Sequence, residues 1–254
     1  MAISFTTGGT INNATVGTSL VFGAFSATAT QAVVVGVSIL STGVSVSGIT
    51  DTAGNTYTLQ AAGNNGSNVR VELWAAHGIT GNGSNVITVA LSGSSLASAA
   101  FEEYAGVTAI GNVSPVSTGN NTTPNAPIAT QDSNNWGVAA YGVASSSGDT
   151  IATWSVTIRR SLFPALTTAG IVLSDISSIL QSPTMYLFNV LSANRNWAAA
   201  SLELRSGSAA VTTAVSIMPS VTDANVGANH QKMAGPATPV ISGTSGSGNS
   251  GFVA

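Results

Sequence analysis

Turn signals divide this chain into short segments with strand-like periodicity, and this pattern constrains the fold more than any other feature. In residues 68–74 the apolar side chains of Val69, Val71 and Leu73 alternate with other residues, so they lie on one face of an expected strand. Residues 33–40 form a continuous apolar and β-branched run. That run is too short for a typical helix and predicts a central strand covered on both faces.

Many further segments have the same character. Strands are expected at residues 56–61, 86–91, 98–104, 136–144, 151–158, 185–191 and 197–204. Gly, Asn and Asp cluster between them and mark turns, because these residues tolerate positive φ or bond their own backbone. Only residues 169–180 keep a rough helical spacing and could form a short helix instead. The pattern predicts an all-β fold, an antiparallel β-sandwich of jelly-roll-like form.

The composition changes near residue 206 and separates a body from an arm. Residues 1–206 are expected to form the β-sandwich body, with an N-terminal arm plus the first strand over residues 1–30. Residues 207–254 are low in complexity and rich in Gly, Ser and Ala, which predicts an extended, mostly irregular C-terminal arm.

Charge is scarce: only 6% of the residues are charged, with 6 Lys+Arg, 9 Asp+Glu and a net charge of −3. Because the few basic residues are spread along the chain, they cannot neutralise a run of phosphates. We therefore expect no nucleic-acid partner. The hydrophobic content of 44% at this low net charge excludes a disordered chain. Without cysteine there is no disulfide, no thiolate metal site and no thiol nucleophile.

Neither a membrane span nor a secretory signal is expected. The most apolar run, residues 32–40, is far shorter than the roughly 20 residues that a spanning helix needs. The opening sequence MAISFTTGGTINN lacks a basic region followed by a long apolar one. We therefore expect no membrane partner and synthesis in a cytoplasm.

Each candidate for catalysis has a plainer structural explanation. Glu102 and Glu103 are neighbours in an expected strand, so they point to opposite faces and cannot share a pocket; a salt bridge or an edge charge is the expected role. His77 and His230 have no second ligand at metal-binding spacing. No G-x-S-x-G elbow supports a serine nucleophile. We expect no enzyme activity, no catalytic residue, no metal and no cofactor.

Two polar clusters leave an alternative open. Asp51, Asn55 and the carbonyls between them could bind Ca²⁺, although a tight turn explains the sequence D-T-A-G-N equally well. Arg70, Glu72 and Trp74 share the other face of the 68–74 strand. Such a face is typical of sugar-binding strands and protein interfaces, or of a cross-strand pair on the outer surface of a sandwich.

The scarcity of charge implies an outer surface of Ser, Thr, Asn, Gly and Ala. Charged side chains normally keep monomers apart and protect the edges of sheets. Small neutral side chains also lose little entropy when they become ordered at an interface. We interpret the composition as suited to self-assembly into a homo-oligomer or a larger array.

The motifs of residues 51–107 occur in a recognisable order. They are DTAGNTY, then VELW, then GNGSNVITV, then EEYAGV; the later segments NNWGVAA at 134–140 and NWAAASLE at 196–203 follow the same pattern. This order resembles a β-sandwich domain found in structural (decoration and fibre) proteins of tailed-phage virions and in large secreted bacterial proteins. The resemblance covers most of residues 30–206 and carries no catalytic residues.

The resemblance, with the absence of a signal peptide, implies a virion location and a non-enzymatic structural role. The expected protein is a capsid decoration or cement protein that binds neighbouring subunits through its sandwich and extended termini. Its partners would be further copies of itself and the major capsid or tail protein. The alternatives are a tail-fibre, head-fibre or baseplate component, and a carbohydrate-binding or adhesin module that binds a surface glycan through Trp74, Trp136, Trp154 and Trp197.

Overall fold

The structure, a computed structural model, describes residues 2–13, 15–66, 68–128, 134–146, 148–153, 156–164, 169–177 and 185–207. They belong to the first of two units, Met1–Gly207 and Ser208–Ala254. From Ser208 onward, the arm expected over residues 207–254 lies outside the described residues. Every helix or strand assigned within the described residues is a strand, and all the pairings between these strands are antiparallel. No helix among them has the length and hydropathy to cross a membrane.

The first ten strands form a unit that we name the N-terminal sandwich. They are β1 (Ser4–Asn12), β2 (Gly17–Val21), β3 (Phe25–Ala27), β4 (Ala32–Ile39), β5 (Val46–Asp51), β6 (Thr58–Asn65), β7 (Val69–His77), β8 (Asn82–Asn85), β9 (Ile87–Ser95) and β10 (Ala97–Ala105). The larger sheet has the order β1-β10-β4-β7-β6 and the smaller β2-β9-β5, while β3 pairs with β8. Apolar side chains such as Val35 and Val37 of β4 and Val89 of β9 share one core between these two sheets.

The remaining strands form a second unit, the C-terminal sandwich. They are β11 (Val107–Asn121), β12 (Asn125–Ile128), β13 (Trp136–Ala144), β14 (Ile151–Thr153), β15 (Thr157–Leu162), β16 (Ala169–Ile176), β17 (Met185–Leu191) and β18 (Arg195–Ser206). The larger sheet has the order β11-β18-β13-β16-β15 and the smaller β12-β17-β14. Tyr141, Val172 and Leu187 lie in the core between them.

The two sandwiches repeat the same strand order and the same register. In both, the first strand pairs with the last and the second with the next to last, as in a jelly roll. Val34 of β4 lies opposite Glu102 and Ala75, and Val138 of β13 lies opposite Leu202 and Asp175. The outermost pairs of the larger sheets also agree: β6 shifts register against β7 between Leu59 and Ala61, and β15 shifts against β16 at the equivalent point between Ile158 and Arg160. We interpret this agreement as an internal duplication.

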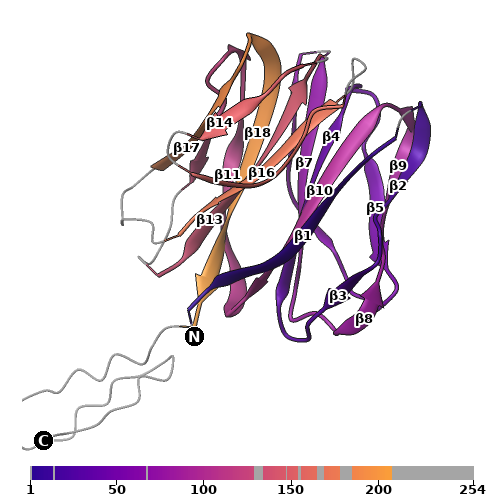
Figure 1. The fold of residues 1–254 in the computed structure, drawn as a ribbon, viewed down its shortest axis with the longest axis vertical. Helices are drawn as coiled ribbons and strands as arrows, with labels where there is room; N and C mark the ends of the chain where they lie inside the picture. The colour runs from indigo at the N-terminus through magenta and orange to yellow at the C-terminus, as the bar shows by residue number, and fades with distance from the viewer. Residues whose placement is uncertain are drawn as a thin grey trace, which may run out of the picture. The chain divides into compact units, whose positions relative to one another are not determined.

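The larger sheets of the two sandwiches pack face to face. Figure 1 shows the N-terminal sandwich in indigo to magenta beside the C-terminal sandwich in pink to orange. Side chains such as Val34 and Leu73 from one and Leu173 and Leu202 from the other form a third buried cluster, which we call the shared core. A Cβ added to Gly36 would lie 2.9 Å from the Cβ of Ala140 and from Cδ2 of Leu173. Glycine therefore permits the close approach of the two sheets at this position.

The structure confirms the antiparallel, jelly-roll-like β-sandwich and the central strand buried on both faces. All eight residues of β4 are buried, because one face meets the N-terminal core and the other the shared core. The body contains two such sandwiches, which the sequence pattern does not reveal.

Two local expectations are wrong. The helix considered at residues 169–180 is strand β16 over Ala169–Ile176. Its apolar residues occur on both faces because the strand lies between two cores, and this continuous run produced a misleading helical spacing. The first 30 residues hold three paired strands, β1 to β3, rather than an arm and a single strand.

Candidate functional site: the buried polar clusters

Every described arginine, aspartate and glutamate makes a polar contact inside the chain. Four ion pairs join Arg70 to Glu72, Arg159 to Asp175, Arg195 to Asp149 and Arg205 to Glu203. Of the others, Asp51, Glu102 and Glu103 accept hydrogen bonds, and Arg160 donates to the carbonyl of Gly8. All these carboxylates except that of Asp51 are buried. Among the described residues, the carboxylates are therefore mostly buried and bonded within the fold.

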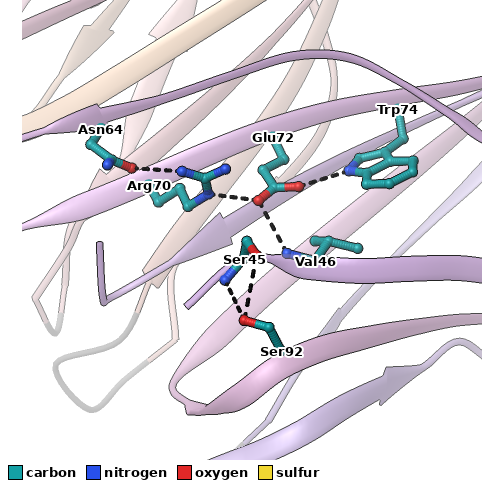
Figure 2. A network of polar contacts seen from close by, with 7 residues as sticks. All are labelled: Ser45, Val46, Asn64, Arg70, Glu72, Trp74 and Ser92. Atoms are coloured by element: carbon teal, nitrogen blue, oxygen red, sulfur yellow. Dashed lines mark hydrogen bonds and ion pairs between the residues drawn. The ribbon is translucent and has the colours of Figure 1, made fainter. Parts of the chain in front are cut away.

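Glu72 is the centre of a polar network inside the N-terminal sandwich (Figure 2). Its Oε1 accepts hydrogen bonds from Nε of Arg70 at 2.6 Å and from the backbone N–H of Val46 at 3.1 Å. Its Oε2 accepts from Nε1 of Trp74 at 2.9 Å. Because Val46 begins β5 and Glu72 lies on β7, the carboxylate ties the two sheets together.

This network corrects one expectation. The alternating pattern suggested that Arg70, Glu72 and Trp74 form an outer polar face, but Glu72 is only 1% exposed and its face packs on the smaller sheet. Val69, Val71 and Leu73, expected on the buried face, do lie in the shared core. Both faces of β7 are therefore buried. The alternation of residues within one strand cannot tell such a strand from one with an exposed face.

The turn that follows β5 is held by the carboxylate of Asp51. Oδ1 accepts from the backbone N–H of Asn55 at 2.9 Å, and Oδ2 accepts from side chains of Asn55, Tyr57 and Asn85 at 2.8 to 3.0 Å. Burial opposes ionisation here, but these hydrogen bonds outweigh it and lower the pKa of Asp51. Gly54 supplies a φ of +75° within the turn. The carboxylate is thus occupied by donors of its own chain, the arrangement of a structural turn.

Glu102 and Glu103 point to opposite faces of β10, as expected. Glu103 accepts the backbone N–H of Thr28 at 2.7 Å, whereas Glu102 contacts Tyr104 in the shared core. The expected role as a salt bridge or an edge charge is wrong. β10 lies between β1 and β4, and both carboxylates are buried.

The cluster around Glu102 joins the two sandwiches. The hydroxyl of Tyr104 contacts Oε2 of Glu102 and lies 3.1 Å from Oδ2 of Asp175, which also accepts from Nε of Arg159 at 2.7 Å. Burial raises the pKa of Glu102 to about 8, although the Tyr104 contact opposes the shift. Burial also raises the pKa of Asp175, against the effect of Arg159.

Aromatic rings enclose this cluster. The guanidinium of Arg159 lies 5.0 Å from the ring centre of Phe5 and 5.9 Å from that of Trp136. Tyr104 packs edge-on against both rings, with centroids 6.0 Å apart. Such a setting lowers the local polarity and accounts for the high cost of a charge on Glu102.

The described tryptophans are engaged inside the fold. Trp74 donates to Glu72; Trp197 is 2% exposed and donates to Oδ1 of Asn121; Trp136 packs on Tyr104. Trp154 lies outside the described residues. Among the large hydrophobic side chains of the described part, the exposed aromatic is Tyr186. The described rings do not supply the coplanar exposed platform that a glycan module requires.

The histidines and other metal-ligating groups remain scattered. His77 ends β7 with its Nε2 3.2 Å from the carbonyl of Val107, and His230 lies outside the described residues. Within the described part, no three His, Cys, Asp or Glu side chains gather as a metal-binding group. The polar clusters that exist are suited to fastening sheets together and, around Glu102, to holding a proton.

Comparisons with family models, with curated proteins and with solved structures find no match to this chain.

Proposed function

We propose that the chain is a non-enzymatic structural protein of a virus particle, in which it serves as a capsid decoration or cement protein. The observation that carries the proposal is the inward direction of charge. Every described Arg, Asp and Glu is engaged within the fold, and the one lysine of the chain is Lys232. An exterior with so few free charges lacks the repulsion that keeps ordinary soluble proteins apart.

The exposed apolar side chains support the same proposal. Val21 is 52% exposed on β2, Leu59 42% on β6 and Val113 39% on β11. Each of these strands is at the edge of its sheet. Natural sheets usually protect their edges with charged residues, and edges without them favour pairing with another chain. Many weak contacts of this kind add up when symmetry repeats them.

Mass spectrometry of purified particles tests the proposal directly. Cells that carry the gene would be induced to release virus particles, and the particles would be purified and digested. We expect this chain as a stoichiometric component of the particles. Its absence from purified particles that contain all other structural proteins would contradict the proposal.

A truncated chain tests whether the C-terminal residues are needed for incorporation into the particle. Removing residues 222–254 leaves the described strands and their three cores intact, so the truncated chain should unfold at the temperature of the full chain. We expect it to be lost from particles. Normal incorporation would show that the sandwiches alone make the binding contacts.

A tail-fibre, head-fibre or baseplate component is the alternative within the same class, and the location of the protein on the particle distinguishes the two. Labelling purified particles with an antibody against the sandwiches would place it on the capsid in our proposal. Labelling confined to the tail would favour the alternative.

A further inference from the structure

The contact between Glu102, Tyr104 and Asp175 crosses from one sandwich to the other. Glu102 and Tyr104 belong to β10 of the N-terminal sandwich, and Asp175 belongs to β16 of the C-terminal sandwich. The Tyr104 hydroxyl joins the two carboxyl groups. All three residues are at most 1% exposed.

The duplication supplies an internal comparison for this cluster. By register, Leu202 is the counterpart of Glu102, Leu204 that of Tyr104, and Ala75 that of Asp175. These counterparts also lie in the shared core. The same backbone positions are thus filled once by apolar side chains and once by a polar cluster, so the fold itself does not require the cluster.

The number of protons in the cluster follows from its contacts. Two oxygen–oxygen contacts, from Tyr104 to Glu102 and from Tyr104 to Asp175, need two protons, and the tyrosine hydroxyl provides one. A carboxyl group must provide the other. Asp175 also accepts from Arg159, which favours its charged form, so the proton belongs on Glu102. Oε1 of Glu102 and Oδ1 of Asp175 are both buried without a hydrogen-bond partner, so a single negative charge in the cluster is tolerated better than two.

The groups around Glu102 do not compensate a negative charge there. Tyr104 faces it from β10 and Asp175 from β16, and the carboxylate of Asp175 disfavours a second one. Arg159 and Arg160 of β15 favour ionisation, but Arg159 is bound to Asp175 and Arg160 to the carbonyl of Gly8. The neighbouring strands β1, β4 and β13 contribute the uncharged side chains of Phe5, Val34 and Trp136.

We propose that Glu102, Tyr104 and Asp175 form a proton-dependent latch between the two sandwiches, which is closed while Glu102 is protonated. Ionisation of Glu102 releases its proton to solvent and leaves two buried carboxylates facing one hydroxyl hydrogen. The repulsion between these two carboxylates is relieved when the shared core loosens and water reaches the cluster. The latch is independent of the proposed particle role.

The direction of the pH effect follows from linkage. Because the pKa of Glu102 is raised in the folded protein, the stability that its protonation contributes is complete below its ordinary value of 4.5. This contribution falls as the pH rises and is lost above about 8. The latch therefore closes on the acid side and loosens on the alkaline side.

Two measurements on the full chain test the latch. We expect the ¹³C carboxyl signal of Glu102, assigned by its absence in E102Q, to titrate several units above the ordinary glutamate value. We also expect amide exchange in β10 and β16 of the native protein to increase between pH 7 and 9 relative to E102Q at the same pH. E102Q keeps a neutral donor toward Tyr104, and E102L copies the counterpart Leu202, so at least one of them should fold.

The control is E103Q, which changes the neighbouring residue on the opposite face of the same strand. It should leave the titration of Glu102 and the pH response of β10 and β16 unchanged. A Glu102 signal that titrates near 4.5 would overturn the proposal. So would an amide exchange response in β10 and β16 that is the same in the native protein, E102Q and E102L. Neither result depends on whether the chain occurs in virus particles.

Discussion

At the scale of single residues, the described charged side chains of this protein hold strands and turns together inside the fold. Glu72 joins two strands of different sheets, Asp51 holds a turn, and Asp175 meets Tyr104 of the other sandwich. Glu72 and Asp175 each accept at least one hydrogen bond from a residue distant in sequence, and Asp51 accepts across its turn. Since buried polar groups are costly when they lose a partner, single substitutions at these positions should have large effects.

Asp51 gives the clearest test of this role. D51N keeps the shape of the side chain but replaces an acceptor oxygen by an NH₂ group that faces the donors of Asn55, Tyr57 and Asn85. We expect the free energy of unfolding at neutral pH to fall by about 1–3 kcal/mol. Thermal or urea unfolding measures the change, with T50A on the exposed face of β5 as the control.

The same substitution has a predicted pH signature. The pKa of Asp51 is lowered in the folded protein, so its contribution to stability is present above its ordinary pKa of 3.8 and is lost as the pH falls through the folded value. The stability difference between the native chain and D51N should therefore shrink in acid. A difference that stays constant down to pH 2 would show that the charge of Asp51 does not contribute.

At the scale of strands, a substitution can test the face of β7 that lies in the shared core. Val71 is fully buried in the shared core, so V71D places an unpaired charge there and should unfold the body or cost at least about 3 kcal/mol. T58D, on the exposed side of the neighbouring strand β6, should change stability little. An unchanged melting temperature for V71D would mean that this face of the strand is not inside.

Gly36 tests the contact between the two larger sheets. An added Cβ would lie 2.9 Å from the Cβ of Ala140, which is fixed to the backbone of the other sandwich. G36A should therefore destabilise the protein by about 1–3 kcal/mol through overpacking. G48A is the matched control, because nothing lies within 4 Å of the equivalent Cβ. Equal melting temperatures for the two variants would contradict the close packing of the sandwiches.

The sequence predicted the buried strands well and the edge strands poorly. The segments at 33–40, 68–74, 98–104 and 136–144 correspond to β4, β7, β10 and β13, which lie inside their sheets and are largely apolar. β11 was not predicted, because it is an edge strand, is half exposed and contains Pro115. Its strand conformation depends on pairing with β18, which its own sequence does not reveal.

The polar clusters could be predicted only in part. Glu102 and Glu103 were correctly placed on opposite faces, because alternation is a property of the strand itself. Their burial and the partners Tyr104, Asp175 and Arg159 depend on how two distant sheets pack, which no local pattern contains. The signal that was available is Asp175 itself, a carboxylate within the mostly apolar segment GIVLSDI.

At the scale of the whole molecule, two jelly-roll sandwiches share a core and direct their charges inward. The duplication was not visible in the sequence because counterparts such as Glu102 and Leu202 differ in chemistry while they occupy equivalent register. What the two sandwiches share is the pattern of strands and bulges. The described surface exposes few carboxylates and has apolar residues at sheet edges.

Light scattering of the purified full chain over a concentration series tests assembly through these surfaces most directly. We predict a closed oligomer of defined mass, a trimer or larger. Its mass should be the same at low and high ionic strength, because the surface contacts involve few charges. A monomer at every concentration, or an oligomer that dissociates as salt is added, would contradict assembly through these surfaces.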